Sequence, residues 1–399
     1  MRQTFVLLAC AIPLLLVSPA QAADKAMDKA ADKIKIGMAT TLSGPTAQLG
    51  IDTRDGFNLA IKHLGGKLGG LPVDLQVTDD QFNPEVAKQI IDRFVKRDRV
   101  DVATGMINSA ALLATAPMLF SNRTPYISTN AGPSQLAGKE CSPWFVSTSW
   151  QNDNVHEAAG HHANQRNYKN AYLLAPDYPA GRDVLSGFKR TYKGQIVTEA
   201  YVKLGQLDYA AEIAQLRAAK PEMAFVFLPG GMGINFVKQF FASGLSKDIQ
   251  LLLPGTSSDQ DILPAVGDAM LGLFNTSQWA LDLDNPENKR FVADFDREFK
   301  RLPSAFAAQA YDAALRIDAA VLAVKGNLAN REAFMKAIHT VKAKSVRGEY
   351  KVNVNGYPIQ NYYLRVVSRG PDGRLFNKSL GVVLKDHADA YAKDCPLKY

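Results

Sequence analysis

Two short loops carry residue types that suit the binding of an anion. Asn108 and Ser109 follow a short apolar strand, and Ser128, Thr129 and Asn130 end a second one. A helix is expected to begin after Ser109, and the unpaired backbone N–H groups of its first turn face the same place. A carboxylate needs several oriented donors and little side-chain bulk around it. The sequence therefore predicts a carboxylate-binding floor at the ends of these two strands.

The remaining polar clusters lack the spacing that catalysis or metal binding requires. His156, Glu157 and His161 depart from the His-Glu-x-x-His arrangement of zinc sites, so we expect a solvated helix there. Asp79 and Asp80 precede an Asn-Pro pair, which favours a turn and a helix cap over a pair of catalytic acids. The sequence has no Gly-x-Ser-x-Gly motif, and no free cysteine accompanies a histidine. We therefore expect neither an enzyme nor a bound metal or cofactor.

Two further features concern loops that follow strands. The segment Gly230–Gly233 lies between a strand and a helix but lacks the glycine spacing of a dinucleotide-binding motif. It is either a tight turn or a place where the backbone approaches a ligand closely, and both interpretations stay open. Trp150 and Tyr178 lie in loops where the walls of a cleft are expected. Core packing is the default for the tryptophan, whereas a tyrosine in a loop more often contacts a ligand.

The elements that position these loops alternate between strand and helix. Apolar strands are expected at residues 34–38, 71–77, 100–103, 126–128, 171–175, 196–201, 223–228, 250–253 and 272–275, with helices between them. Three long helices follow at 286–300, 304–324 and 331–341, and a hairpin is expected from 350 to 367 around an Asn-Gly pair. Such alternation indicates parallel sheets covered on both faces, and the length fits two of them. A ligand cleft is expected where the polar loops meet.

The first residues have the pattern of an export signal. Arg2 precedes an apolar run, and Ala20-Gln21-Ala22 fits the cleavage rule, so residues 1–22 are expected to be removed and 23–33 to be flexible. Export leaves Cys141 and Cys395, which we expect to form a disulfide, the alternative being two buried free thiols. The net charge of +7 comes without a basic run between aromatics, so no nucleic-acid partner is expected.

Six segments, in this order, resemble a known family, namely Ile34–Gly37, Leu42–Pro45, Ala47–Gly50, Gly105–Ser109, Pro125–Thr129 and Asp177–Gly181. They are similar to the leucine/isoleucine/valine-binding type of periplasmic receptor for ABC transporters, and the resemblance covers nearly the whole chain from about Lys33. It implies an α/β protein of two Rossmann-like lobes joined by three hinge crossings near Ser149, Trp279 and Arg347. Lobe 1 would comprise residues 34–149 and 280–347, and lobe 2 residues 150–279 and 348–399, including the hairpin and the tail.

The resemblance also implies where the ligand binds. Asn108, Ser109 and the backbone of Thr129, Asn130 and Ala131 would hold a carboxylate in lobe 1. Leu49 takes the position where the family often has an aromatic lid residue. Closure would bring the side chains or loops of lobe 2 over the other end of the ligand, and we expect Tyr178, Met232, Gly255 and Thr256 to contribute there.

One departure from the family pattern concerns the ammonium group of an amino acid. The amino-acid receptors place an acidic residue just after the proline of the loop at Pro254, and this chain has Gly255 there. Asp259 and Asp261 lie further along at the wrong spacing. Because a buried ammonium without a counter-charge is costly, we expect a carboxylate without an amino group.

Three short segments look similar to a branch of this family that binds aromatic acids, namely Ser142-Pro-Trp-Phe, Pro229-Gly-Gly-Met-Gly and Asp394-Cys-Pro. We therefore expect a monomeric periplasmic receptor that captures an aromatic or hydrophobic carboxylate and delivers it to an ABC permease. A branched-chain or other amino acid is the alternative ligand. A ligand sensor that signals to a membrane regulator is the alternative role.

Overall fold

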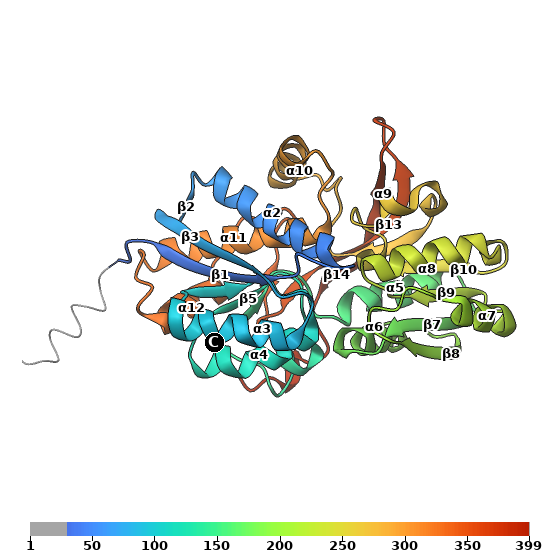
Figure 1. Ribbon diagram of the computed structural model, residues 1–399, viewed down its shortest axis with the longest axis horizontal. Coiled ribbons are helices and arrows are strands. Elements are labelled where there is room, and N and C mark those ends of the chain that lie inside the picture. The colour runs from blue at the N-terminus through green and yellow to red at the C-terminus, as the bar shows by residue number, and fades with distance from the viewer. Residues whose placement is uncertain (1–29, 399) are drawn as a thin grey trace, which may run out of the picture.

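The structure is a computed structural model in which residues 30–398 are described. It contains two sheets, which lie in opposite halves of the molecule (Figure 1). The expected signal peptide and most of the segment 23–33 lie outside the described residues. No helix within residues 30–398 is both long and apolar enough to cross a membrane. The first sheet has the strand order β2-β3-β1-β4-β5-β6, and the second has the order β12-β13-β11-β10-β9-β7-β8, with β14 added on β13.

The first sheet is parallel apart from the short edge strand β2, which pairs antiparallel with β3. Its strands are β1 (Ile34–Thr40), β2 (Lys67–Leu68), β3 (Leu71–Asp79), β4 (Val102–Thr104), β5 (Tyr126–Ser128) and β6 (Phe145–Ser147). One face is covered by α3 (Pro84–Arg93) and α4 (Ser109–Ser121). The other is covered by α2 (Ala47–His63), α10 (Pro286–Phe299), α11 (Ala305–Ala323) and α12 (Arg331–Thr340).

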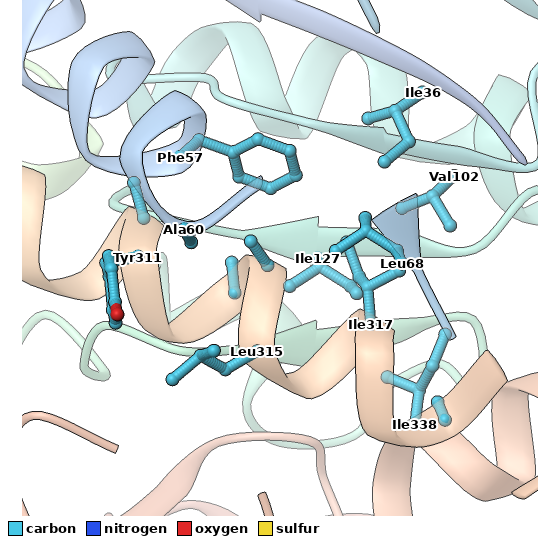
Figure 2. Packing of buried hydrophobic residues seen from close by; sticks show 14 of the residues in the cluster. Ile36, Phe57, Ala60, Leu68, Val102, Ile127, Tyr311, Leu315, Ile317 and Ile338 are labelled. Atoms are coloured by element: carbon cyan, nitrogen blue, oxygen red, sulfur yellow. The ribbon is translucent and has the colours of Figure 1, made fainter. Parts of the chain in front are cut away.

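The core of this lobe shows why the late helices return to the first sheet. Ile36 and Val102 of the sheet meet Phe57 of α2 and Ile317 of α11 in one apolar cluster (Figure 2). The helices α2 and α11 approach closely at Gly56, where a Cβ atom would lie 2.1 Å from the backbone oxygen of Ala307. Burial of this continuous apolar surface therefore joins residues far apart in the sequence.

The second sheet has a parallel centre and an antiparallel margin. Its parallel strands are β7 (Asn170–Pro176), β8 (Gln195–Val202), β9 (Met223–Val226), β10 (Gln250–Pro254) and β11 (Phe274–Ser277). One face packs on α5 (Asn154–Gln165) and α6 (Pro179–Thr191). The other packs on α7 (Ala210–Ala219), α8 (Gly231–Ala242) and α9 (Leu263–Val266). The prediction of an α/β fold with two helix-flanked sheets is confirmed.

The C-terminal region departs from the expected hairpin. The short β12 (Lys351–Val352) does pair with β13 (Pro358–Arg369), but the main hairpin joins β13 to β14 (Leu375–His387), a strand that the sequence did not indicate. The antiparallel β13 also pairs with β11 and so extends the second sheet. The strand β14 escaped prediction because its side chains are mostly half-exposed or exposed and lack a regular apolar alternation.

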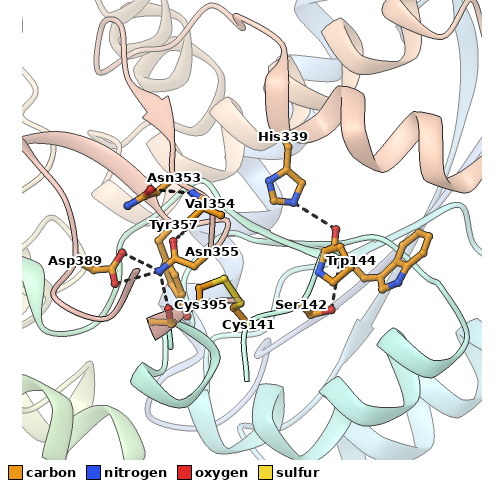
Figure 3. The surroundings of a disulfide bond; sticks show 12 residues. Cys141, Ser142, Trp144, His339, Asn353, Val354, Asn355, Tyr357, Asp389 and Cys395 are labelled. Atoms are coloured by element: carbon orange, nitrogen blue, oxygen red, sulfur yellow. Dashed lines mark hydrogen bonds between the residues drawn. A yellow bond between two sulfur atoms is a disulfide. The ribbon is translucent and has the colours of Figure 1, made fainter. Parts of the chain in front are cut away.

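The sequence analysis places the tail in lobe 2, but in the structure the tail also contacts the first lobe. Cys395 forms a disulfide with Cys141, which lies in the first lobe, so the expected pairing is confirmed (Figure 3). Nearby, the backbone oxygen of Gly356 accepts a hydrogen bond of 2.8 Å from Ser147 at the end of β6. The turn before β13 and the end of the chain therefore bind the first lobe, although the strands between them belong to the second sheet.

Two buried arginines hold the segments that connect the lobes. The guanidinium of Arg347 donates to Asp312 at 2.9 Å and to the backbone oxygen of Ser149 at 3.2 Å. Arg365 donates to the backbone oxygen of Trp279 at 3.0 Å. Each of the three positions expected as hinge crossings thus takes part in a charge-assisted hydrogen bond of a buried arginine, and their role as hinges stays a prediction. The exact lobe boundaries stay a prediction.

Candidate ligand-binding cavity

A small cavity lies between the two sheets. Residues from both lobes and from the first crossing line it. They are Leu49, Phe82, Ile107, Ser109, Asn130, Trp150, Asn152, His156, Tyr178, Ala180, Val184, Phe227, Pro229, Thr256 and Phe306. Apolar and aromatic side chains dominate this set, with a few polar groups among them, as is typical of a small-molecule site.

The floor of the cavity in the first lobe forms at the N-terminus of α4. Asn108 caps this helix, because its side-chain oxygen accepts a hydrogen bond of 2.8 Å from the backbone N–H of Ala110. Ser109 is the first helical residue, and its hydroxyl oxygen accepts a hydrogen bond of 3.3 Å from Asn152. The hydroxyl proton of Ser109 is therefore left to donate. Together with the positive end of the helix dipole, it suits a carboxylate.

The walls of the cavity are aromatic. The ring of Trp150 meets Phe306 edge-on with centroids 6.2 Å apart, and Tyr178 stacks on Phe227 at 6.4 Å. Phe82 of the first lobe lies 6.4 Å from Tyr178 of the second. Aromatic rings from both lobes therefore line the cavity, and such rings offer π-faces and edges to a bound molecule.

A strained turn places Phe82 in this wall. Both Gln81 and Phe82 have positive φ angles, of 55° and 58°, which cost energy for residues other than glycine. Asp79 and Asp80 hold the turn, since they accept hydrogen bonds from the backbone N–H groups of Gln81 and Phe82 at 2.9 and 3.0 Å. The prediction that the two aspartates shape a turn is confirmed, and its consequence is the position of Phe82.

The helix α5 is buried, so the expectation of a solvated helix was wrong. His156, Glu157 and His162 are all at most 4% exposed. The helix carries small residues that allow close packing: a Cβ atom at Gly160 would lie 2.6 Å from the backbone oxygen of Phe188 on α6. The charged and imidazole side chains suggested a solvated surface, whereas this small-residue face decides the packing. Within residues 30–398, no group of His, Cys, Asp or Glu side chains is arranged to hold a metal ion.

The cavity lining contains no aspartate, glutamate, lysine or arginine among the described residues. Gly255 packs against the buried Arg365, where a Cβ atom would lie 2.8 Å from a guanidinium nitrogen. Asp259 accepts a hydrogen bond of 2.8 Å from the backbone N–H of Ala305 and is not among the lining residues. Asp261 is also outside that set, and burial raises the pKa of its carboxyl group. The lining residues themselves therefore include no carboxylate that could pair with an ammonium group.

Half of the ligand-binding residues expected from the sequence line the cavity. They are Leu49, Ser109, Asn130, Tyr178 and Thr256. The other five, Asn108, Thr129, Ala131, Met232 and Gly255, lie outside the lining set. Asn108 acts on the site through the cap of α4, and the sulfur of Met232 accepts a hydrogen bond of 3.3 Å from the backbone N–H of Gly205 inside the second lobe. The ligand contacts themselves stay a prediction.

Most of the wall residues were missed. Phe82, Ile107, Asn152, His156, Phe227 and Phe306 line the cavity, but single aromatic or polar residues in loops and buried helices give no local signal. Trp150 is the exception, because its place in a loop after β6 suggested a cleft wall. The one signal that could have indicated Phe227 is its position at the carboxyl end of β9.

Hydrogen bonds join the lobes at several places around the cavity, including these three. One is the hydrogen bond between Ser109 and Asn152. A second joins Ser134 of the first lobe to Asp183 of α6. In the third, the backbone N–H of Gly231 donates to the backbone oxygen of Pro45 at 2.9 Å.

The third contact shows a role of the glycine segment that neither of the two interpretations included. A Cβ atom at Gly230, where φ is +56°, would lie 2.8 Å from the backbone oxygen of Pro45. The glycines therefore permit a close backbone approach, and what approaches is the loop of the opposite lobe.

Comparisons with known proteins agree with this architecture. A solute-binding protein of an ABC transporter from R. palustris, in complex with benzoate, is 30% identical and superimposes with a TM-score of 0.86 over 92% of this chain and 100% of that chain. A second, from Rhodopseudomonas palustris BisB5 in complex with 3,4-dihydroxybenzoic acid, is 30% identical with a TM-score of 0.85 over 90% and 99% of the chains.

The names of the curated relatives refer to different ligands, namely leucine, isoleucine and valine. The Leu/Ile/Val-binding protein homolog 6 of Brucella melitensis is 26% identical over 362 residues, which are 88% of this chain and 91% of that protein. The periplasmic binding protein family matches residues 33–373. The resemblance seen in the sequence is thus confirmed, and the chain belongs to the periplasmic binding protein family.

Proposed function

We propose that this chain is the periplasmic solute-binding component of an ABC importer and that its solute is an aromatic carboxylate. The observation that carries the proposal is the combination of a donor floor at Ser109 with aromatic walls and no acidic side chain in the lining. An aromatic acid needs the first two features and no counter-charge, whereas an amino acid needs a partner for its ammonium group.

Capture involves binding and closure without a chemical step. The carboxylate docks at the N-terminus of α4, and the ring lies between Trp150, Phe306, Tyr178 and Phe227. Closure of the lobes buries the ligand and forms the contacts at Asp183 and Gly231, which the open protein lacks. The closed surface is then presented to a membrane permease.

The relatives support both candidate ligands to different degrees. The two solute-binding proteins crystallised with benzoate and 3,4-dihydroxybenzoic acid are each 30% identical to this chain. The curated relatives named for leucine, isoleucine and valine are 26% identical, which keeps a branched-chain amino acid as the second candidate. The uncharged lining favours the aromatic acid.

Isothermal titration of the purified protein tests the proposal. We expect micromolar binding of benzoate-type acids and no measurable binding of leucine, isoleucine or valine. The variant Ser109→Ala should weaken aromatic-acid binding by about tenfold, because it removes a hydroxyl donor to a charged group. Ser121→Ala, at the exposed far end of the same helix, is the matched control and should bind as the wild type does. Binding of leucine but of no aromatic acid would refute the proposal.

A further inference from the structure

The imidazole of His156, a residue of the cavity lining, holds an unused hydrogen-bond acceptor. The side chain lines the cavity and is 2% exposed. Its Nδ1 lies 2.5 Å from the backbone oxygen of Asn152, one turn earlier in the chain. Because a carbonyl oxygen only accepts, Nδ1 carries the proton of the neutral ring, and Nε2 holds a lone pair. Nε2 is buried and has no hydrogen-bond partner within the described part of the chain.

The surroundings keep this ring neutral. The rings of Phe225 and Phe227 each lie 6.0 Å from the imidazole, in edge-on contact. Burial lowers the pKa of His156 to about 4, although the neighbouring Glu157 acts in the opposite direction. A neutral imidazole with its Nδ1 proton engaged cannot pair with a carboxylate at Nε2. It can only accept a hydrogen from a donor.

A second unpartnered group lies on the same lobe. Thr256 lines the cavity, and its hydroxyl oxygen is buried and has no partner within residues 30–398. The carboxylate floor at Ser109 belongs to the opposite lobe. An elongated ligand held by its carboxylate at Ser109 would therefore direct its other end toward polar groups of the second lobe. Leaving a buried acceptor such as Nε2 without a donor is costly, so its partner is expected to arrive with the ligand.

We propose that the ligand is a ring-hydroxylated aromatic carboxylate and that its hydroxyl donates to Nε2 of His156. This inference rests on the proposed function and narrows its substrate class. It makes His156 a specificity-determining residue, because a site built to pair a hydroxyl discriminates against the analogue that lacks it.

A ligand series on the wild-type protein tests the inference without any variant. Benzoate, 3-hydroxybenzoate, 4-hydroxybenzoate and 4-methoxybenzoate are titrated by calorimetry. We expect at least one hydroxybenzoate to bind about tenfold or more tightly than benzoate. The methoxy compound should show no such gain, since it has an oxygen but no proton to donate. Equal affinities for benzoate and both hydroxybenzoates would overturn this inference and leave the proposed function standing, whereas binding of amino acids alone would overturn both.

A pair of histidine variants locates the effect. His156→Phe keeps a ring of similar size and removes the acceptor, so the ratio of hydroxybenzoate affinity to benzoate affinity should fall to about one. His162→Phe is the matched control, because His162 is also buried on α5 but does not line the cavity. That variant should keep the preference for the hydroxylated ligand. Loss of the preference in both variants, or in neither, would contradict the role of Nε2.

Discussion

Ser134 of the first lobe donates two hydrogen bonds to Asp183 of the second, from its backbone N–H at 2.9 Å and from its hydroxyl at 2.6 Å. Asn152 donates to the same carboxyl group at 3.0 Å. Burial of Asp183, reinforced by the nearby charge of Asp153, raises its pKa to about 6 despite these donors. The contact that joins the lobes therefore includes an acid that holds its proton more strongly in the closed, folded protein than in water.

This raised pKa predicts how the free energy of unfolding depends on pH. The unfolded chain releases the Asp183 proton near its ordinary pKa of 3.8, and the folded protein releases it at about 6. Between these values the unfolded state binds fewer protons, so stability falls as pH rises through this window and levels off above it. The free energy of unfolding that is lost across this window because of Asp183 is about 3 kcal/mol at most.

Asp183→Asn tests this dependence, because an amide can replace the protonated acid between Ser134 and Asn152. We expect the variant to gain stability relative to the wild type between about pH 4 and about pH 7 in denaturant unfolding. Asp248→Asn, an exposed residue of the same lobe, controls for the loss of one negative charge. A constant difference between Asp183→Asn and the wild type across this range would contradict the assigned pKa.

Substitution of Gly230 should impair closure. An alanine there would place its Cβ 2.8 Å from the backbone oxygen of Pro45, and φ is +56°. Gly244→Ala is the matched control, since φ is +76° and no atom lies within 4 Å of its Cβ. Both variants should lose about 1 kcal/mol of stability through backbone strain. Only Gly230→Ala should also lose ligand affinity, by about tenfold, in calorimetric titration. Equal affinities of the two variants would show that closure does not need this glycine.

The disulfide between Cys141 and Cys395 should contribute to stability and not to binding. It closes a loop across a sequence separation of 254 residues, and neither cysteine lines the cavity. Replacement of both cysteines by serine is expected to reduce the free energy of unfolding by about 2–5 kcal/mol. Ligand affinity should stay within about twofold of the wild-type value. A large loss of affinity in the folded variant would link the tail to the site.

Tyr178 should contribute to ligand binding through its aromatic ring and not through its hydroxyl group. Its side chain stacks on Phe227 and meets Phe82 of the opposite lobe. Tyr178→Phe keeps these contacts, so we expect affinity for benzoate to change by less than about threefold. Tyr178→Ala opens the wall and should weaken binding by more than about tenfold. If Tyr178→Phe weakens binding as much as Tyr178→Ala, the hydroxyl group binds the ligand and the ring does not explain the effect.

The parts of the site that follow from local sequence were predictable, and those that depend on tertiary packing were not. Ser109 and Asn130 lie at strand ends beside a helix start, so the order of elements alone brings them together. Phe306 begins a helix almost 200 positions after Ser109, and it reaches the cavity only because α11 packs on the first sheet. His156 was misread because charged neighbours suggested a solvated helix, while Gly160 and the alanines around it decided the burial.

The same distinction between local sequence and tertiary packing explains which parts of the fold were predictable. Strand–helix alternation predicted both parallel sheets, because that pattern is repeated along the chain. The strand β14 depends on pairing with β13, which no local pattern encodes. The disulfide that ties the tail to Cys141 was predicted from the two cysteines that remain after export. The length of the β13–β14 hairpin could be known only from the assembled structure.

Native mass spectrometry of the protein with an equimolar mixture of benzoate, 4-hydroxybenzoate, leucine, isoleucine and valine tests the central claim most directly. The mass added to the protein shows whether the cavity between Ser109 and His156 holds benzoate, 4-hydroxybenzoate, valine, or one of the isomers leucine and isoleucine, which have the same mass. We predict that the complex retains an aromatic acid, with 4-hydroxybenzoate ahead of benzoate. A complex that retains leucine, isoleucine or valine in preference to both aromatic acids would contradict the claim.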